Sequence, residues 1–181
     1  MSWDQYITTL KADSQVEEAA IWGCDKGAES KWAGGPGLDS ITADEIKKLA
    51  GDRSAFRQCG PHISGKKCML LTDNMDAEGI YCLNLKTAAD ADGNRYSICV
   101  GKTNKGKTGR EGDTERERER ERQCALCCCC KVDLSHPHVC LSVCLSVSTA
   151  LIIAKGTKDA NGGHLAEQVF KIVKYLREAG Y

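Results

Sequence analysis

The chain has 181 residues, and its 25 Lys and Arg side chains are balanced by 25 Asp and Glu side chains. This length is enough for one domain with a hydrophobic core but is short for two domains. The balanced charge gives no indication of a nucleic-acid partner, and no stretch approaches the roughly 18 apolar residues of a membrane-spanning helix. The opening MSWDQYITTL also lacks the basic and apolar regions of a signal peptide. We therefore expect a soluble, intracellular protein.

A first helix is predicted at the start of the chain. Ser2 can act as its N-cap, and Gln5 stands three residues later, as in a capping box. The apolar residues that follow Ser2 recur at intervals of three and four, which places them on one helical face. These residues are Trp3, Tyr6, Ile7 and Leu10.

Two strands and a short helix are predicted next. The segments 19–24 (AAIWGC) and 30–34 (SKWAG) have the composition of strands, and the turn-forming DKGAE separates them. Thr42 and Glu45 have the spacing of a second capping box, so a helix should begin there. Gly51 marks the end of this helix, because glycine is favoured just after a helix C-terminus.

Three further strands are predicted at 67–73, 80–86 and 95–101, each bounded by turn-forming residues such as Asp-Gly-Asn. The connections between them are short. Strands joined in this way must be antiparallel neighbours, since a parallel pair needs a crossover of a dozen or more residues.

Residues 106–149 differ in character from the rest of the chain. Four Glu-Arg pairs are followed by a cysteine-rich piece that ends in VCLSVCLSVST. A repeat of period four fits neither a strand nor a sustained helical face. Both repeats match the translation of simple DNA repeats, GA for Glu-Arg and TGTC for Cys-Leu-Ser-Val. We therefore interpret this segment as a retained intron translated in frame, and we expect it to form a disordered loop.

The 12 cysteines form two populations. Those of the insert lie between Cys124 and Cys144, and with His136 and His138 they offer enough sulfur and imidazole for zinc. Four adjacent cysteines, however, cannot all reach one tetrahedral ion without strain. We assign no metal ligand, and a metal-binding or redox-sensing loop is the alternative function. The other cysteines are scattered singly, and several should be buried as small hydrophobes: Cys24, Cys59, Cys68, Cys82 and Cys99.

Beyond the insert, a strand is predicted at 150–156 and an amphipathic helix at 164–178, with the pair Gly162-Gly163 breaking the chain before the helix. With the insert set aside, the fold class is α+β, an antiparallel meander with helices from both chain ends packed on it. The inward residues of the last helix should be Leu165, Val169, Ile172, Val173 and Leu176.

Nothing in the sequence supports catalysis. His62 and His164 have no cysteine or serine at motif spacing, and lone histidines are usually surface or capping residues. The stretch GKTNKGKTG at 101–109 contains Gly-Lys-Thr twice but lacks the full phosphate-loop pattern. We therefore expect neither an enzyme nor a cofactor.

Residues 1–105 and 150–181 together resemble profilin, the family of small actin-monomer-binding proteins. The motifs of this resemblance are SWDQYI, AAIWG, KWA, GKKCMLLTD, GKTNK, ALIIAKG and YLREAGY. The resemblance implies one domain that contains the insert, with a central antiparallel sheet flanked by helices and with adjacent N- and C-terminal helices. It also implies a cytoplasmic location with the actin cytoskeleton.

The resemblance further implies an adaptor that regulates actin polymerisation through two binding surfaces. Proline-rich segments would bind between the terminal helices, because aromatic grooves hold a preformed polyproline II helix at low entropic cost. The positions that match are Trp3, Tyr6, Trp32, Tyr175, Leu176 and Tyr181. For monomeric actin they are Leu70, Thr72, Lys86, Arg95, Asn161, Gly163 and Lys171. For phosphoinositide head groups, which profilins also bind, they are Lys86, Lys102 and Lys105.

Overall fold

The computed structural model describes residues 2–103 and 149–180. The predicted insert falls outside these ranges apart from Thr149, so its disorder and the metal-binding alternative stay predictions. Lys105 and Tyr181, which belong to the predicted sites, also lie outside the described residues. The described residues all belong to one unit, which consists of residues 1–105 and 147–181.

An antiparallel sheet of seven strands forms the centre of the described residues, in the order β2-β1-β7-β6-β5-β4-β3. All the predicted strands are present, and their ends differ from the prediction by a few residues. The short edge strand β3 was not predicted. The strands are β1 (Val16–Gly23), β2 (Ser30–Gly34), β3 (His62–Ile63), β4 (Lys66–Asn74), β5 (Cys82–Thr87), β6 (Ser97–Lys102) and β7 (Ala150–Gly156).

The strand order corrects the predicted simple meander. β4 to β7 do follow one another as antiparallel neighbours, but β1 lies between β2 and the last strand, β7. Ile21 of β1 is paired with Ile152 of β7, and Ala19 with Ala154. This pairing brings together the two terminal helices, because one precedes β1 and the other follows β7.

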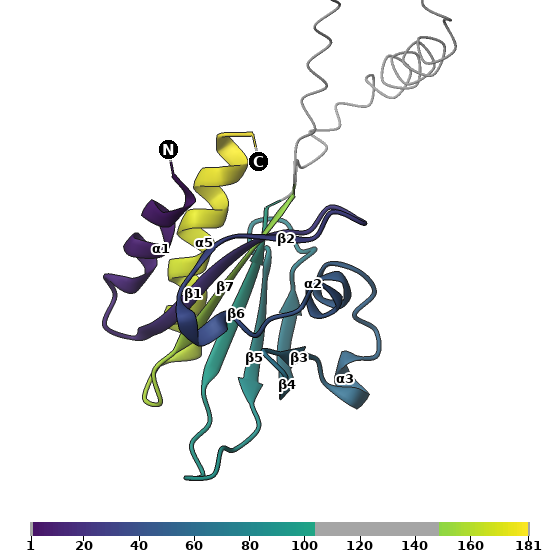
Figure 1. Ribbon diagram of the computed structural model, residues 1–181, viewed down its shortest axis with the longest axis vertical. Helices are drawn as coiled ribbons and strands as arrows, with labels where there is room; N and C mark the ends of the chain where they lie inside the picture. Colours follow the sequence, from purple (N-terminus) through teal and green to yellow (C-terminus); the bar gives the residue numbers. More distant parts are fainter. Residues whose placement is uncertain (1, 104–148, 181) are drawn as a thin grey trace, which may run out of the picture. The chain divides into compact units, whose positions relative to one another are not determined.

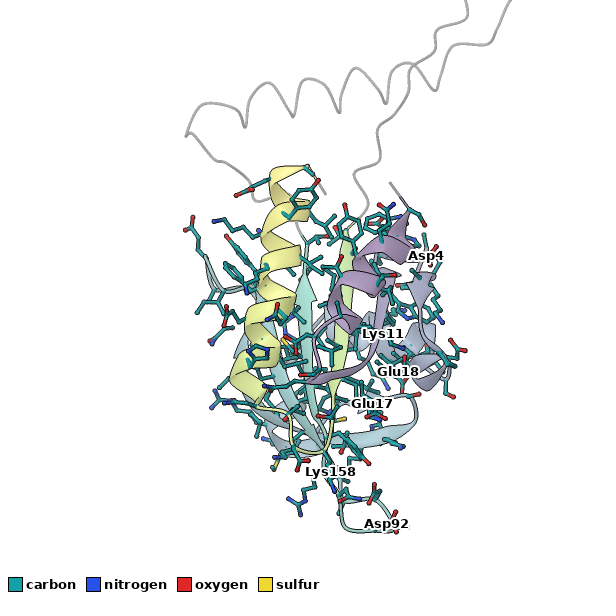
Figure 2. The ribbon with its side chains drawn as sticks, turned by 90° about the vertical axis from the view of Figure 1, so that its left-hand side faces the viewer. Asp4, Lys11, Glu17, Glu18, Asp92 and Lys158 are labelled. Atoms are coloured by element: carbon teal, nitrogen blue, oxygen red, sulfur yellow. The ribbon has the colours of Figure 1, made fainter. Side chains whose placement is uncertain are left out.

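The terminal helices cover one face of the sheet, and the shorter helices lie on the other side. α1 (Trp3–Lys11) and α5 (Gly162–Glu178) contact each other and run side by side in both views (Figures 1 and 2). The opposite side has the 3-10 helix η1 (Pro36–Leu38), α2 (Ala43–Ala50) and α3 (Phe56–Cys59). Within the described residues, no helix has both the length and the apolar character needed to cross a bilayer.

The caps of α1 and α5 differ in detail from the prediction. Ser2 caps α1, but its hydroxyl accepts from the Asp4 backbone N–H at 3.3 Å, and the backbone N–H of Gln5 donates to the Ser2 carbonyl. The predicted capping box is therefore absent. In α5, the Asn161 side chain accepts from the Gly163 N–H at 2.9 Å, so both glycines belong to the first helical turn and do not break the chain.

Glu45 confirms the second predicted capping box and also fixes a neighbouring turn. Its backbone N–H donates to the Thr42 hydroxyl at 3.3 Å, and its carboxylate accepts from the Thr42 N–H at 3.0 Å. The same carboxylate accepts from the N–H groups of Ser64 and Gly65, in the turn between β3 and β4. One side chain thus ties the start of α2 to this hairpin.

The core has two layers, one on each face of the sheet. Ile152 of β7 packs with the layer beneath α1 and α5, whereas Leu151 and Ile153 pack with the layer on the α2 side. Burial on both faces explains why this strand is apolar at consecutive positions. All the inward residues predicted for α5 are buried, which confirms its apolar face: Leu165, Val169, Ile172, Val173 and Leu176.

Candidate functional site

A row of aromatic side chains lies at one end of the two terminal helices. Trp3 of α1 is 4.7 Å from Trp32 of β2, measured between ring centroids. The rings of Trp3 and Tyr6 are 5.8 Å apart, and those of Tyr6 and Tyr175 of α5 are 6.1 Å apart. These separations are typical of packed aromatic pairs. Three elements that are distant in the sequence thus build one continuous row, Trp32–Trp3–Tyr6–Tyr175, which we call the aromatic row.

The local sequence explains how the aromatic row is positioned. Trp3 and Tyr6 are three residues apart on α1, so they lie on the same side of that helix. The Trp32 indole N–H donates to the Ser30 hydroxyl at 3.2 Å, which orients the ring. Gly23, on the neighbouring strand, leaves space for it, because an added Cβ there would come within 2.7 Å of the indole. Trp32 can therefore take this position because Gly23 has no side chain.

The side chains of the aromatic row are supported by the core below them. Trp3, Tyr6 and Trp32 are partly buried and pack against the layer beneath α1 and α5, while Tyr175 keeps 48% of its surface exposed. Leu176, predicted to contact the ligand, is 1% exposed and belongs to that core layer. Its role is to support the row, because almost none of its surface is accessible.

The two helices are joined again near their other ends. The Asp13 carboxylate lies 2.6 Å from His164 Nε2, and it accepts from the Gln15 backbone N–H at 2.8 Å. The Gln15 hydrogen bond, followed by that to His164, lowers the pKa of Asp13. Gln15 Oε1 also accepts from the Asn161 N–H at 2.9 Å. His164 is therefore neither a cap nor an isolated surface residue, and its pairing was missed because its partner lies at the far end of the sequence.

The residues predicted to bind actin divide between two faces of the sheet. Lys86 and Thr72 lie on the face that α5 covers in part, and Thr72 Oγ1 accepts from the Asn84 side chain at 2.9 Å. Leu70 is on the opposite face, where it packs against the layer on the α2 side. Successive side chains of β4 point to opposite faces of the sheet. Met69 is paired with Lys86 and shares its face, so Leu70 lies on the other face. The α5 and loop members of the set are exposed or nearly so: Arg95, Asn161, Gly163 and Lys171.

Two exposed apolar residues were missed by the sequence analysis. Met69 is 52% exposed and Leu71 is 48% exposed, both on β4. Leu71 stands at a bulge, where the pairing with β5 shifts by one residue. α5 packs on β5, β6 and β7, so the face of β4 extends beyond the helix. The run Cys-Met-Leu-Leu could have indicated this exposure, because a strand covered on one face only cannot bury four successive apolar side chains.

The two described lysines of the predicted phosphoinositide site do not share a surface. Lys86 is paired with Ser97, the first residue of β6, whereas Lys102 is the last residue of that strand. Lys102 is paired with Leu151, which packs on the α2 side, and its Nζ donates to the Ala50 carbonyl at 3.3 Å. They therefore lie at opposite ends and on opposite faces of the sheet, so these two lysines could not contact the same head group.

The scattered cysteines are largely structural. Cys68, Cys82 and Cys99 are buried as predicted, whereas Cys59 is exposed and Cys24 is half-buried. Burial raises the pKa of both Cys24 and Cys68 to about 11, so these thiols are poorly reactive at neutral pH. Across residues 2–103 and 149–180, no group of three or more His, Cys, Asp or Glu side chains is arranged to hold a metal ion.

Sequence comparison matches the chain to one family. The family model described as Profilin matches residues 1–106. Human profilin-1 is 35% identical over 106 residues, which are 57% of this chain and 75% of that protein. Human profilin-2 is 24% identical over 183 residues, covering 99% of this chain and 98% of the relative.

Structure comparison finds the same fold in solved structures. Mouse profilin IIa, in complex with a double repeat from the FH1 domain of mDia1, aligns with a TM-score of 0.70 and 23% identity over 100% of both chains. Profilin IB of Acanthamoeba castellanii aligns with a TM-score of 0.59 and 18% identity over 99% of this chain and 100% of that one. The family model covers more than half of the sequence, and human profilin-1 exceeds 30% identity over three quarters of its own length. The chain therefore belongs to the profilin family.

Proposed function

We propose that this chain is an adaptor that binds monomeric actin and proline-rich segments, and so regulates actin polymerisation. The observation that supports this best is the aromatic row on α1, β2 and α5 of a profilin-family chain. The chain acts by binding, and no catalytic group is required. Its place is the cytoplasm with the actin cytoskeleton, where it meets both partners.

The aromatic row suits a proline-rich ligand for physical reasons. A polyproline II segment is already extended, with three residues per turn and about 3.1 Å per residue, so little conformational entropy is lost on binding. Its rings pack flat against aromatic faces, and its carbonyls have no internal partners. Indole and phenol groups offer both a face for packing and a polar donor at the edge. Tyr181, which the resemblance also assigns to this site, is part of this proposal.

Actin is assigned to the exposed part of the sheet on β4 and β5 together with α5. Met69, Leu71 and Lys86 provide apolar and basic surface there, and Lys171 of α5 adds a further charge. Asn161 and Gly163 add the start of α5 to this surface, and Arg95, in the loop before β6, is the remaining member assigned to it. β2 and β4 are five strand positions apart in the sheet, which corresponds to roughly 24 Å between the strands that carry the outer parts of the two surfaces. On α5 the two surfaces adjoin, because Lys171 lies one helical turn before Tyr175. The proposal is that both partners are nevertheless held at once.

Phosphoinositide binding, if it uses Lys86, would compete with actin, because that lysine belongs to the actin surface. Lys102 would contribute to a separate site near α2. Head-group binding by an actin-free chain would then decrease as actin is added. No part of this assignment requires a nucleic-acid partner.

A tryptophan-fluorescence titration of the full chain with a proline-rich peptide tests the proposal. Trp3 and Trp32 lie in the aromatic row, whereas the third tryptophan, Trp22, is 8% exposed on the other face of the sheet. A saturable change in emission is expected with the proline-rich peptide and none with an alanine-rich peptide of equal length. Unchanged emission at a saturating peptide concentration, or an equal response to both peptides, would contradict it.

A further inference from the structure

One asparagine stands directly before a glycine. Asn161-Gly162 is the only Asn-Gly pair in the sequence, whereas Asn74, Asn84 and Asn94 precede Met, Leu and Arg. Asn161 is exposed and is the N-cap of α5, and Gly162 is the first residue of that helix. The pair therefore lies at the surface, in the first turn of a helix.

An asparagine followed by glycine can lose its side-chain amide without an enzyme. The backbone nitrogen of Gly162 can attack Asn161 Cγ, and nothing obstructs this nitrogen, because glycine has no Cβ. The attack forms a bond between Gly162 N and Cγ and breaks the bond between Cγ and Nδ2. Ammonia leaves with the hydrogen of the Gly162 N–H, and a five-membered succinimide remains. Water then opens the ring at either carbonyl and gives aspartate or isoaspartate, so the only co-reactant is the solvent.

The fold itself does not require a glycine at position 162. An added Cβ there would lie 3.7 Å from Ser97 Oγ, which is an ordinary contact distance. Gly162 is not among the glycines with positive φ, whereas Gly93 has a φ of +80° and serves a turn that favours glycine. In a helix, alanine is also more favourable than glycine. Gly162→Ala therefore changes the reactivity of the pair without displacing its surroundings.

The helix cap controls how often the pair can react. Asn161 Oδ1 accepts from the Gly163 N–H at 2.9 Å, and the backbone of Asn161 is extended, with a ψ of 119°. The succinimide ring can close only after ψ has rotated away from this value and the cap has opened. Two exposed hydrogen bonds hold the closed arrangement, the cap itself and the bond from the Asn161 N–H to Gln15 Oε1 at 2.9 Å. Opening of such a helix end costs far less free energy than global unfolding.

The two products differ in what they leave of the cap. Aspartate keeps a capping oxygen and adds a negative charge at the positive end of the helix dipole. Isoaspartate carries an additional methylene in the main chain, which displaces both the capping oxygen and the N–H that binds Gln15. Gln15 also donates its backbone N–H to Asp13, the partner of His164. Isoaspartate should therefore loosen the junction between the start of β1 and the start of α5.

We propose that Asn161-Gly162 is a site of spontaneous deamidation, gated by the N-cap of α5, that converts Asn161 to aspartate and isoaspartate. The single Asn-Gly pair, its exposure and the two exposed hydrogen bonds that hold it are the observations that carry this inference. The reaction adds one negative charge to the start of α5. It is a property of the chain alone and does not depend on actin or on proline-rich ligands.

The test is incubation of the full chain at mildly alkaline pH, followed by tryptic digestion and mass spectrometry of the segment 159–171. A synthetic peptide of the same sequence is the uncapped reference, and a sample digested before incubation corrects for conversion during digestion. The acid form should accumulate at Asn161 about tenfold more slowly than in the peptide, because two exposed hydrogen bonds must open first. Conversion as fast as in the peptide would contradict the gating. No conversion after about thirty peptide half-lives, or equal conversion at Asn74, Asn84 and Asn94, would overturn the site.

Two variants separate the chemistry from the gating. Gly162→Ala should slow conversion about tenfold in the full chain and also in the free peptide, because the added Cβ obstructs the attacking nitrogen. Gln15→Ala removes one of the two hydrogen bonds and should accelerate conversion about threefold in the full chain. Lys174→Gln, near the other end of α5, is the matched control and should convert as the wild type does. Conversion of Gly162→Ala at the wild-type rate would refute the assigned reaction, and an unchanged rate in Gln15→Ala would refute the gating.

The stability of the products tests the role of the cap. Chromatography of the aged chain isolates the isoaspartate form, and Asn161→Asp reproduces the aspartate form. The isoaspartate form should melt about 4 °C below the unmodified chain, the shift expected when a domain of this size loses one cap. Asn161→Asp should melt no lower than the wild type. An isoaspartate form as stable as the unmodified chain would contradict the assigned role of Asn161.

Discussion

The aromatic row and the exposed face of β4 are both apolar surfaces, but they are built differently. Trp3, Tyr6 and Trp32 are rings seated on a buried core, and each is held by a neighbour at 4.7 to 6.1 Å. Met69 and Leu71 are aliphatic side chains, about half exposed, on a strand beyond β5, β6 and β7, where the main contacts of α5 lie. A rigid ring loses little entropy on binding, whereas a flexible side chain must be ordered by its partner. We therefore expect binding energy to be concentrated in the row and spread out over β4.

The largest effect is expected at the centre of the aromatic row. Trp3 touches both Tyr6 and Trp32, so Trp3→Ala removes the middle of the surface. We expect about 100-fold weaker binding of a proline-rich peptide, the loss typical of a central aromatic residue. Calorimetry measures this directly, with Lys48→Gln on the far side of the sheet as control. A loss of less than threefold would mean that the row is not where the peptide binds.

A smaller effect is expected when the row is disturbed indirectly. Gly23→Ala adds a methyl group that would approach the Trp32 indole to 2.7 Å, so the ring must move. Peptide affinity should decrease about tenfold, while actin affinity stays unchanged. The emission spectrum of Trp32 should also shift in the free protein. If peptide affinity is retained, Trp32 does not need its observed position to bind.

On β4 the expected loss per residue is smaller. Leu71→Asp places a charge on an exposed apolar surface and should weaken actin monomer binding about threefold, and Met69→Asp should behave in the same way. The double variant should lose about tenfold, because the contributions are spread over the surface. Sedimentation of labelled monomeric actin with each variant gives these values. If one variant alone lost 100-fold, the contrast with the aromatic row would fail.

The smallest effect concerns the contact that joins the helices at their other ends. Hydrogen bonds from the Gln15 N–H and from His164 lower the pKa of Asp13 below its ordinary value of 3.8. A carboxylate with a depressed pKa stabilises the fold above its unfolded pKa, and this contribution is lost as pH falls through its folded pKa. Asp13→Asn should therefore melt at a lower temperature than the wild type at pH 6. The difference should shrink below about pH 3.8, as thermal melts across this range will measure. A constant difference between the two melting temperatures would contradict the role of Asp13.

Much of the fold follows from local sequence signals. The parts that do not follow from them share one cause. The inward face of α5 and the Thr42–Glu45 capping box depend on residues within two turns of one another, and both were predicted. The pairing of β1 with β7 and the contact of Asp13 with His164 join the two ends of the chain, so no local pattern reveals them. The bulge at Leu71 shifts the register by one residue, and alternation alone could not show that Met69, and not Leu70, lies beside Lys86.

The same distinction applies to the binding surfaces. Resemblance to a family placed Trp3, Tyr6, Trp32 and Tyr175 together, and their ring contacts agree with that expectation.

The proposed function requires that one chain holds two partners at once, although their surfaces adjoin on α5, where Lys171 lies one helical turn before Tyr175. Titration of a proline-rich peptide into the purified complex of the full chain with monomeric actin tests it most directly. We predict a peptide affinity within about twofold of that for the free chain, with actin retained throughout. Displacement of actin by the peptide, or a peptide affinity that disappears in the complex, would contradict the account.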